Sequence, residues 1–208
     1  STVHVYRSPL IGIIDESTPT TNLHPYATSK IAGEKAVLYA KQNGLIQGIV
    51  LRICNGGGHP VFSETECWHL ILNDLCKQAV EKKKLILKSD SFLEINLIPL
   101  INVCMGIEHF IQLPKEFLDD SPFNIGSEKS LTLYQIAHQV AARCKVVLGY
   151  EIQIYFKKIN KEVLNDNNRR FNLQTNKSEK TGLILQDNLD QEIDNTLLFC
   201  EKHFSKDR

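Results

Sequence analysis

The stretch HPYATSK, residues 24–30, places a tyrosine and a lysine four residues apart, directly behind a proline. An α-helix advances 3.6 residues per turn, so Tyr26 and Lys30 would lie on one face of a helix that Pro25 starts. A phenol ionises at about pH 10, and a nearby cation favours the phenolate, which can accept a proton. The alternative is an ordinary helix start with two surface residues. The surrounding sequence has to distinguish the two.

The residues on either side predict a β–α–β unit. Thr2–Tyr6 is short and rich in β-forming residues, which predicts a strand, and the Pro-, Gly-, Ser- and Thr-rich stretch 7–25 predicts a long loop. Residues 26–43 predict a helix that Gly44 ends, and GIVLRI (48–53) predicts a second strand. A helix between two strands indicates a parallel sheet, and such sheets bind ligands at the carboxyl ends of their strands.

The predicted helix and the loop after the second strand would both border that edge of the sheet. In the helix, Glu34, Lys35 and Lys41 are expected on the polar side. In the loop CNGGGHP (54–60), three consecutive glycines permit a close approach of the backbone to a ligand. The apolar positions that recur at helical spacing are Ile31, Ala32, Val37, Leu38 and Ala40.

Beyond residue 60, helices alternate with short strands. Thr132 is a candidate cap for one of these helices, and Gly149 is expected to end it. The stretch 157–181 is polar and is expected to be irregular. Helices are predicted at 66–83, 103–112, 131–147 and 187–204, and strands at 85–88, 93–100, 123–126 and 152–156.

The composition is that of an ordinary globular protein. The 208 residues include 24 basic and 24 acidic side chains, so no net charge favours nucleic acid or a membrane surface as partner. No apolar run approaches the roughly 20 residues that span a bilayer. The six cysteines form no CxxC pair, which we interpret as reduced thiols in a cytoplasmic protein, and the seven histidines show no metal-ligand spacing such as HExxH. We therefore expect no metal.

Four segments, STVHVY, HPYATSK, VLRICNGGGHP and FNIGSEKSLTLYQIA, resemble in order and spacing the extended short-chain dehydrogenase/reductase family. Within it they are similar to the NAD-dependent epimerase/dehydratase group, which acts mainly on nucleotide sugars. The resemblance covers nearly the whole chain and implies an α/β fold, a partial Rossmann-like doubly wound parallel sheet. Residues 1–60 would be the C-terminal part of the NAD(P)-binding domain. Residues 61–208 would be mainly a small α/β substrate-binding lobe, with segments returning to the core domain.

The resemblance also implies roles for individual residues. Tyr26 would be the catalytic base or acid, and Lys30 would support the phenolate and hydrogen-bond the nicotinamide ribose of NAD or NADP. Thr2 falls at the position that hydrogen-bonds the reacting substrate hydroxyl. Asn55 matches an asparagine that contacts substrate, although alone it is equally a turn residue. Ile53, at the end of the second strand, would border the cofactor.

Departures from the family pattern restrict the expected chemistry. Dehydratases carry an Asp–Glu pair directly after the threonine, and this chain has Val3 and His4, which disfavours dehydration. Ile95 stands where members often have an arginine that holds a nucleotide diphosphate, which puts a nucleotide-sugar substrate in question. The family's GxxGxxG fingerprint is not in this sequence, and Met105 is its only methionine. We infer a missing upstream segment of roughly a hundred residues.

Two functions therefore stay open. The first is an NAD(P)-dependent sugar epimerase or reductase, whose activity in this chain depends on the upstream half. The second is a non-catalytic binding module of the same fold. By the resemblance, a homodimer would form through the Tyr26 helix and the 66–83 helix, although a face buried within one chain would give the same pattern. The apolar residues for that interface are Ala36, Val37, Ala40, Leu72 and Cys76.

Overall fold

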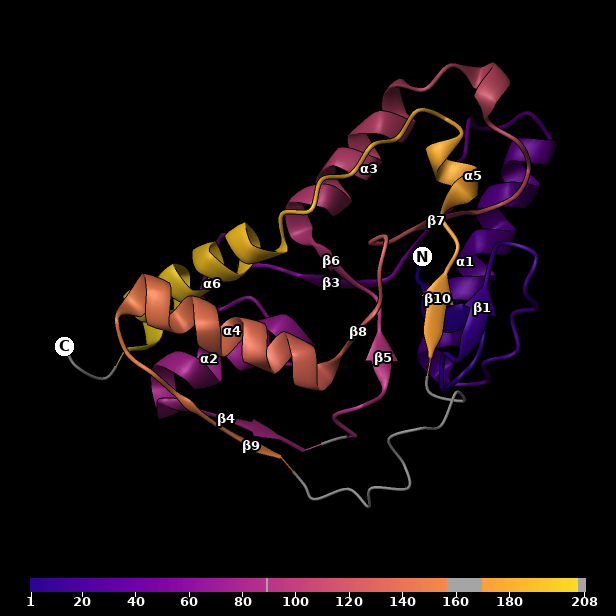
Figure 1. Cartoon of the computed structure of the whole chain (residues 1–208). Coiled ribbons are helices and arrows are strands. Elements are labelled where there is room, and N and C mark those ends of the chain that lie inside the picture. The colour runs from indigo at the N-terminus through magenta and orange to yellow at the C-terminus, as the bar shows by residue number, and fades with distance from the viewer. Residues whose placement is uncertain (89, 157–169, 206–208) are drawn as a thin grey trace.

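The computed structural model of the chain describes residues 1–88, 90–156 and 170–205. It is a mixed α/β fold in which four strand pairs are parallel and one is antiparallel, so the predicted class is confirmed (Figure 1). Each pair joins segments that are distant in the sequence. The parallel pairs are β1 (Gly12–Ile14) with β10 (Phe171–Leu173), β2 (Leu51–Ile53) with β7 (Phe123–Ile125), β3 (Asn55–Gly57) with β6 (Leu97–Pro99) and β4 (Lys84–Leu87) with β9 (Gln153–Phe156); β5 (Glu94–Ile95) pairs with β8 (Leu131–Thr132).

The helices lie in separate parts of the molecule. α2, α4 and α6 pack on one another at one end, and α1 lies at the other end with β1 and β10 (Figure 1). Thr132 and Gln135 form a capping box at the start of α4, and Gly149, with φ of 78°, ends it. The α-helices are α1 (Pro25–Gln42), α2 (Ile71–Lys82), α3 (Leu100–Gln112), α4 (Leu133–Leu148), α5 (Asn176–Glu179) and α6 (Leu189–Phe204), with short 3-10 helices η1 (Val3–Val5) and η2 (Lys115–Phe117).

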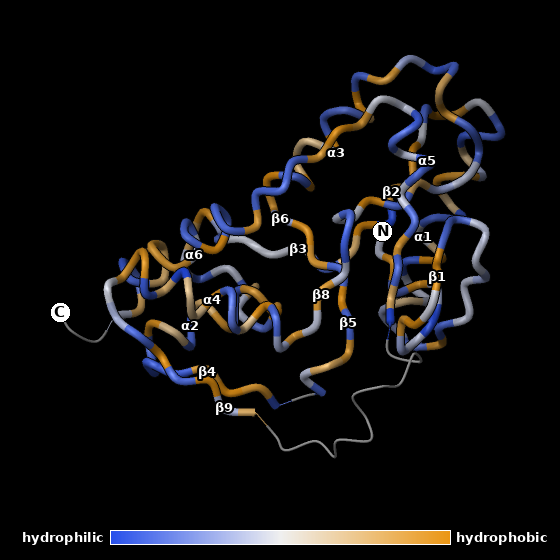
Figure 2. The backbone as a smooth tube through the Cα atoms, viewed as in Figure 1, coloured by the Kyte–Doolittle hydropathy of each residue, from blue (hydrophilic) through white to orange (hydrophobic). Residues whose placement is uncertain are grey.

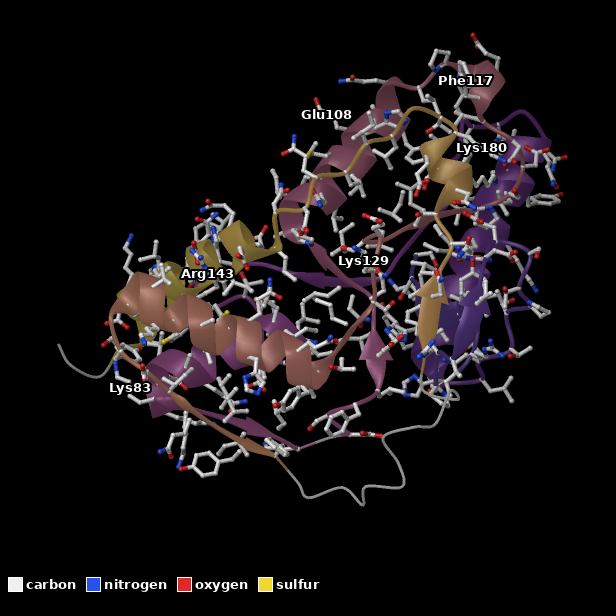
Figure 3. All side chains as sticks on the ribbon, viewed as in Figure 1. Lys83, Glu108, Phe117, Lys129, Arg143 and Lys180 are labelled. Carbon is white, nitrogen blue, oxygen red and sulfur yellow. The ribbon has the colours of Figure 1, made fainter. Side chains whose placement is uncertain are left out.

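Buried side chains form two clusters. The helical cluster lies between α2, α4, α6 and β4, whose KLIL sequence is mostly hydrophobic along the tube of Figure 2. Arg143 fastens α4 to α6 through two hydrogen bonds to the Asp194 carboxylate, and it is labelled in Figure 3. The sheet cluster joins η1 and β1 to β6, α3, β7 and β10. The division of the chain at residue 60 stays a prediction.

The predicted strand at Thr2–Tyr6 is wrong. Only Thr2 pairs, in an isolated parallel bridge with Ile53, and the chain then turns into η1. The Thr2 side chain accepts a hydrogen bond from the His4 amide and caps this turn, so local capping overrides the β-propensity of the two valines. The turn buries Val3, Val5 and Tyr6 together.

Other boundaries differ from the predictions. β1 and β10 lie in stretches predicted to be irregular, because strands of three residues are set by distant pairing rather than by local pattern. α2 starts at Ile71, five residues later than predicted, and α3 starts at Leu100, three residues earlier. The predicted irregular stretch 157–181 lies outside the described residues from 157 to 169.

Two of the residues considered for a homodimer interface are buried within the chain. Leu72 and Cys76 have no exposed surface and belong to the helical cluster with α4 and α6. They therefore face the chain's own core, as the alternative for this helix supposed. On α1, Ala36 is exposed and Val37 and Ala40 are half-buried.

Candidate functional site

The first turns of α1 present Tyr26 and Lys30 together. His24 precedes the helix and accepts a hydrogen bond from the Tyr26 amide through Nδ1 at 3.2 Å, with Pro25 in the first turn. Lys30 Nζ lies 5.5 Å from the centroid of the Tyr26 ring, which places both side chains on one helix face. Tyr26 is 49% exposed. Among the described residues, none hydrogen-bonds the Tyr26 hydroxyl or the Lys30 ammonium, so both groups are available to a ligand.

Hydrogen bonds from the preceding loop hold the start of α1 beside η1. Asn22 Nδ2 donates to the carbonyl oxygen of His4 at 2.7 Å, and the Thr21 amide donates to that of Tyr6 at 2.6 Å. The His24 amide donates to Asn22 Oδ1 at 3.0 Å, which closes the turn into the helix. These bonds bring the Tyr26 helix next to the segment that begins with Thr2, and α1 packs against η1.

Thr2 and Ile53 lie side by side at the end of β2. They form a parallel bridge, and the Ile53 amide donates to the carbonyl oxygen of Ser1 at 3.4 Å. Thr2 is buried, and its Oγ1 accepts from the His4 amide at 3.3 Å. Its hydroxyl hydrogen is left to donate, because this bond uses only a lone pair of the oxygen.

Asn55 begins β3, and both the nitrogen and the oxygen of its side-chain amide have partners. Its backbone amide and its Nδ2 both donate to the carbonyl oxygen of Asn96, each at 3.1 Å. Its Oδ1 lies 3.2 Å from Nε2 of His4. The structure therefore joins Asn55 to η1, the turn that Thr2 caps.

Two of the glycines after Asn55 lie close to side chains of this chain's own helices. A Cβ on Gly57 would lie 2.7 Å from Cβ of Leu72, and a Cβ on Gly58 would lie 2.7 Å from Cβ of Leu100. These glycines allow the backbone to approach the chain's own helices α2 and α3. Part of the predicted loop 54–60 is therefore a strand, β3, and its glycines let the backbone pack closely within the chain.

A buried ion pair connects α1 to β2. Arg52 Nε and Nη2 donate to the two carboxylate oxygens of Glu34 at 2.9 and 2.7 Å, and the guanidinium lies 4.7 Å from the Tyr6 ring centroid. Burial alone would raise the pKa of Glu34, but hydrogen bonds from Arg52 and Ser1 outweigh it and hold that pKa below its ordinary value. Glu34 was expected on the polar side of the helix, but it is buried and its bonds to Arg52 hold the Tyr26 helix against the sheet.

The described part of the chain shows neither a cluster of metal ligands nor a membrane-spanning helix. Within 1–88, 90–156 and 170–205, no group of three or more His, Cys, Asp or Glu side chains is placed to hold a metal ion. Among the described helices, none combines the length and apolar composition that crossing a bilayer needs.

Sequence reasoning missed the residues that organise the site through hydrogen bonds. Asn22 carried a signal, since an asparagine shortly before a helix commonly accepts a hydrogen bond from the backbone amide two residues later, here that of His24. Glu34 and Asn96 carried none, because their partners are distant in the sequence.

Known proteins share the fold of this chain. Residues 1–126, more than half of the chain, match the model of the NAD dependent epimerase/dehydratase family. No curated protein matches the sequence. UDP-glucuronic acid 4-epimerase from Bacillus cereus, solved in complex with NAD, has a similar structure, with a TM-score of 0.78 and 17% identity over 99% of this chain and 61% of that one.

Two further solved structures are similar in fold. dTDP-glucose 4,6-dehydratase from Bacillus anthracis, in complex with NAD, gives a TM-score of 0.71 and 22% identity over 98% of this chain and 60% of that one. RMD from Pseudomonas aeruginosa, complexed with NADPH, gives a TM-score of 0.77 and 15% identity over 98% of this chain and 65% of that one. The chain thus spans less than two thirds of the length of these proteins. The family match places it among their relatives: the chain belongs to the NAD-dependent epimerase/dehydratase family.

Proposed function

We propose that the chain is part of an NAD(P)-dependent enzyme that acts on a hydroxyl of a sugar or nucleotide sugar, as an epimerase or an oxidoreductase. One observation carries this proposal: Tyr26 and Lys30 share the exposed face at the start of α1, with hydroxyl and ammonium free of hydrogen bonds among the described residues. The membership of the chain in its family supports it.

The Tyr26 hydroxyl and the Lys30 ammonium fit the nicotinamide ribose end of the cofactor. The Lys30 ammonium can donate to ribose hydroxyls, and the Tyr26 hydroxyl would lie beside the reacting carbon. Ile53 would border the cofactor from the end of β2. When bound, the nicotinamide supplies a hydride acceptor. The three similar proteins were solved with NAD or with NADPH, which supports either cofactor here.

The chain's own residues would carry the proton transfer. The Tyr26 phenolate accepts the proton of the substrate hydroxyl, and the Lys30 ammonium stabilises the phenolate. Thr2 donates its hydroxyl hydrogen to the same substrate oxygen and so fixes its position. The C–H bond of the substrate carbon breaks as the carbonyl forms, and its electron pair leaves with the hydrogen as hydride. Asn55 would hold another hydroxyl of the substrate.

Epimerisation and oxidoreduction share this step and differ in the next one. In an epimerase the hydride returns to the opposite face of the keto sugar, and Tyr26 returns its proton. In an oxidoreductase the keto product leaves. Dehydration is disfavoured, because Val3 and His4 occupy the positions of the acid and base that eliminate water in dehydratases.

A binding module without turnover is the second candidate. Ile95 favours it, since an isoleucine cannot pair with a diphosphate as the family's arginine does. A homodimer through α1 remains part of the first proposal, with Ala36 exposed on that helix.

Product analysis separates these functions. The native protein is incubated with NAD⁺ or NADP⁺ and, in turn, UDP-glucose, UDP-glucuronic acid, UDP-N-acetylglucosamine or glucose. An epimerase gives an epimer without net reduced cofactor, and an oxidoreductase gives a keto sugar with an equal amount of reduced cofactor. Absence of both, with a measurable dissociation constant for the cofactor or sugar, would support the binding module instead.

A further inference from the structure

His4 and Asn55 meet between η1 and β3, beside Thr2. His4 Nε2 lies 3.2 Å from Asn55 Oδ1, and Asn55 Nδ2 donates to the carbonyl oxygen of Asn96 at 3.1 Å. The second bond fixes the amide, because a turned amide would set its oxygen against the Asn96 oxygen, and neither can donate. The proton between His4 and Asn55 therefore belongs to Nε2 of His4, which donates it to Oδ1.

The anchor of this amide is itself rigid. Asn96 is buried, its Oδ1 accepts from the Ser127 amide at 2.8 Å, and its Nδ2 donates to the Ser127 carbonyl oxygen at 2.9 Å. Gly126 makes room for this pair, since a Cβ there would lie 2.6 Å from Asn96 Oδ1. Asn96 thus ties β3 and β6 to the loop between β7 and β8, which Lys129 marks in Figure 3.

We propose that His4 is a positioning residue for Asn55 and thereby for a sugar hydroxyl of the substrate. A carboxamide has two N–H hydrogens and an oxygen with two lone pairs. Asn96 takes one hydrogen and His4 one lone pair, so one donor and one acceptor remain. A sugar hydroxyl both donates and accepts, and it matches what is left. This inference rests on the proposed function, in which Asn55 contacts the substrate.

Two substitutions of His4 separate its hydrogen bond from its bulk. His4→Gln keeps a donor, since Nε2 of glutamine lies as many bonds from the backbone as Nε2 of histidine. His4→Leu keeps an apolar side chain and removes the donor. His69→Leu is the matched control, because His69 is exposed and has no role in the site. The readouts are the NMR signals of the Asn55 side-chain amide and the calorimetric affinity for UDP-glucose with NAD⁺ present.

His4→Leu is expected to shift the Asn55 amide signals and to weaken UDP-glucose binding about tenfold, the effect of losing one hydrogen bond. His4→Gln and His69→Leu should stay within about twofold of the unchanged protein. Unchanged Asn55 signals and affinity in His4→Leu would overturn the proposal, and so would equal losses in His4→Leu and His4→Gln. If the unchanged protein does not bind UDP-glucose, the nucleotide-sugar function fails, whereas the Asn55 signals still decide whether His4 holds the amide.

Discussion

Replacing Glu34 by glutamine removes one charge from the buried ion pair that joins α1 to β2. Glu34 and Ala27 are the buried residues of α1, so this pair is the main polar anchor of the helix that presents Tyr26. The side chains of Glu34 and Arg52 are 5% and 7% exposed, and two hydrogen bonds of 2.9 and 2.7 Å join them. Because both side chains are buried, water has little access to the Arg52 guanidinium and cannot solvate it in place of the Glu34 carboxylate.

The magnitude depends on the burial of the charge that remains. Breaking a buried pair by removing one partner costs about 3–5 kcal/mol, because the other charge is left uncompensated. The Tyr6 ring beside Arg52 offsets a part of that cost. We therefore expect Glu34→Gln to lower the free energy of unfolding by about 3 kcal/mol. A double substitution, Glu34→Leu with Arg52→Met, should be less destabilised than Glu34→Gln, because no unpaired charge stays buried.

Urea unfolding followed by far-UV circular dichroism measures these differences. Glu108→Gln is the control, since Glu108 is exposed on α3, where it is labelled in Figure 3, and its loss should change stability by less than about 0.5 kcal/mol. The reasoning is refuted if Glu34→Gln costs less than about 1 kcal/mol. It is also refuted if the double variant is less stable than Glu34→Gln.

Burial and charge lead to three further predictions. The pKa of Glu34 is lower in the folded than in the unfolded chain. Its contribution to the free energy of unfolding is therefore complete above the unfolded pKa of about 4.3 and is lost as pH falls through the folded pKa. The urea midpoint should fall over that pH range, and less steeply in Glu34→Gln. Gly57→Ala should cost about 1–3 kcal/mol in urea unfolding, because its Cβ would lie 2.7 Å from Cβ of Leu72, and an unchanged midpoint would contradict this close packing. Under native conditions a thiol reagent should modify exposed Cys104 fast. If the buried cysteines were modified before the protein unfolds, the hydrophobic clusters would have to open in the native state. The buried cysteines are Cys54, Cys76, Cys144 and Cys200.

The sequence predicted elements whose signals are local. The Tyr26 helix had Pro25 at its start and Gly44 just beyond its end, and the structure places it at Pro25–Gln42. The helix capped by Thr132 and ended by Gly149 was likewise predicted within two residues of its bounds. Such signals act within one turn, so they are readable without knowledge of the tertiary structure.

Features set by tertiary contacts could not be predicted. Glu34 occupies a polar position of the amphipathic pattern, yet it is buried because it pairs with Arg52, which belongs to another element. The β-rich start of the chain forms η1, because Thr2 caps a turn that buries Val3 and Val5. β1 and β10 are paired over a separation of more than 150 residues, which no local pattern records. At the candidate site, the spacing predicted that Tyr26 and Lys30 share one helix face, as the structure has them, and their catalytic roles stay a prediction from the resemblance. The bond between His4 and Asn55 had no local signal in the sequence.

The most direct test of the proposed function compares Tyr26→Phe with Tyr39→Phe. Tyr39 lies on the same helix and is 67% exposed, so it controls for the loss of a phenol hydroxyl from α1. The measurements are the dissociation constant for NAD⁺ and the turnover of whichever of the four sugars is active. We predict that Tyr26→Phe binds NAD⁺ within about twofold of the unchanged protein but turns over about 10²–10⁴ times more slowly, the usual contribution of a general acid–base group. Turnover in Tyr26→Phe equal to that of Tyr39→Phe would contradict the assignment of Tyr26 as the proton acceptor.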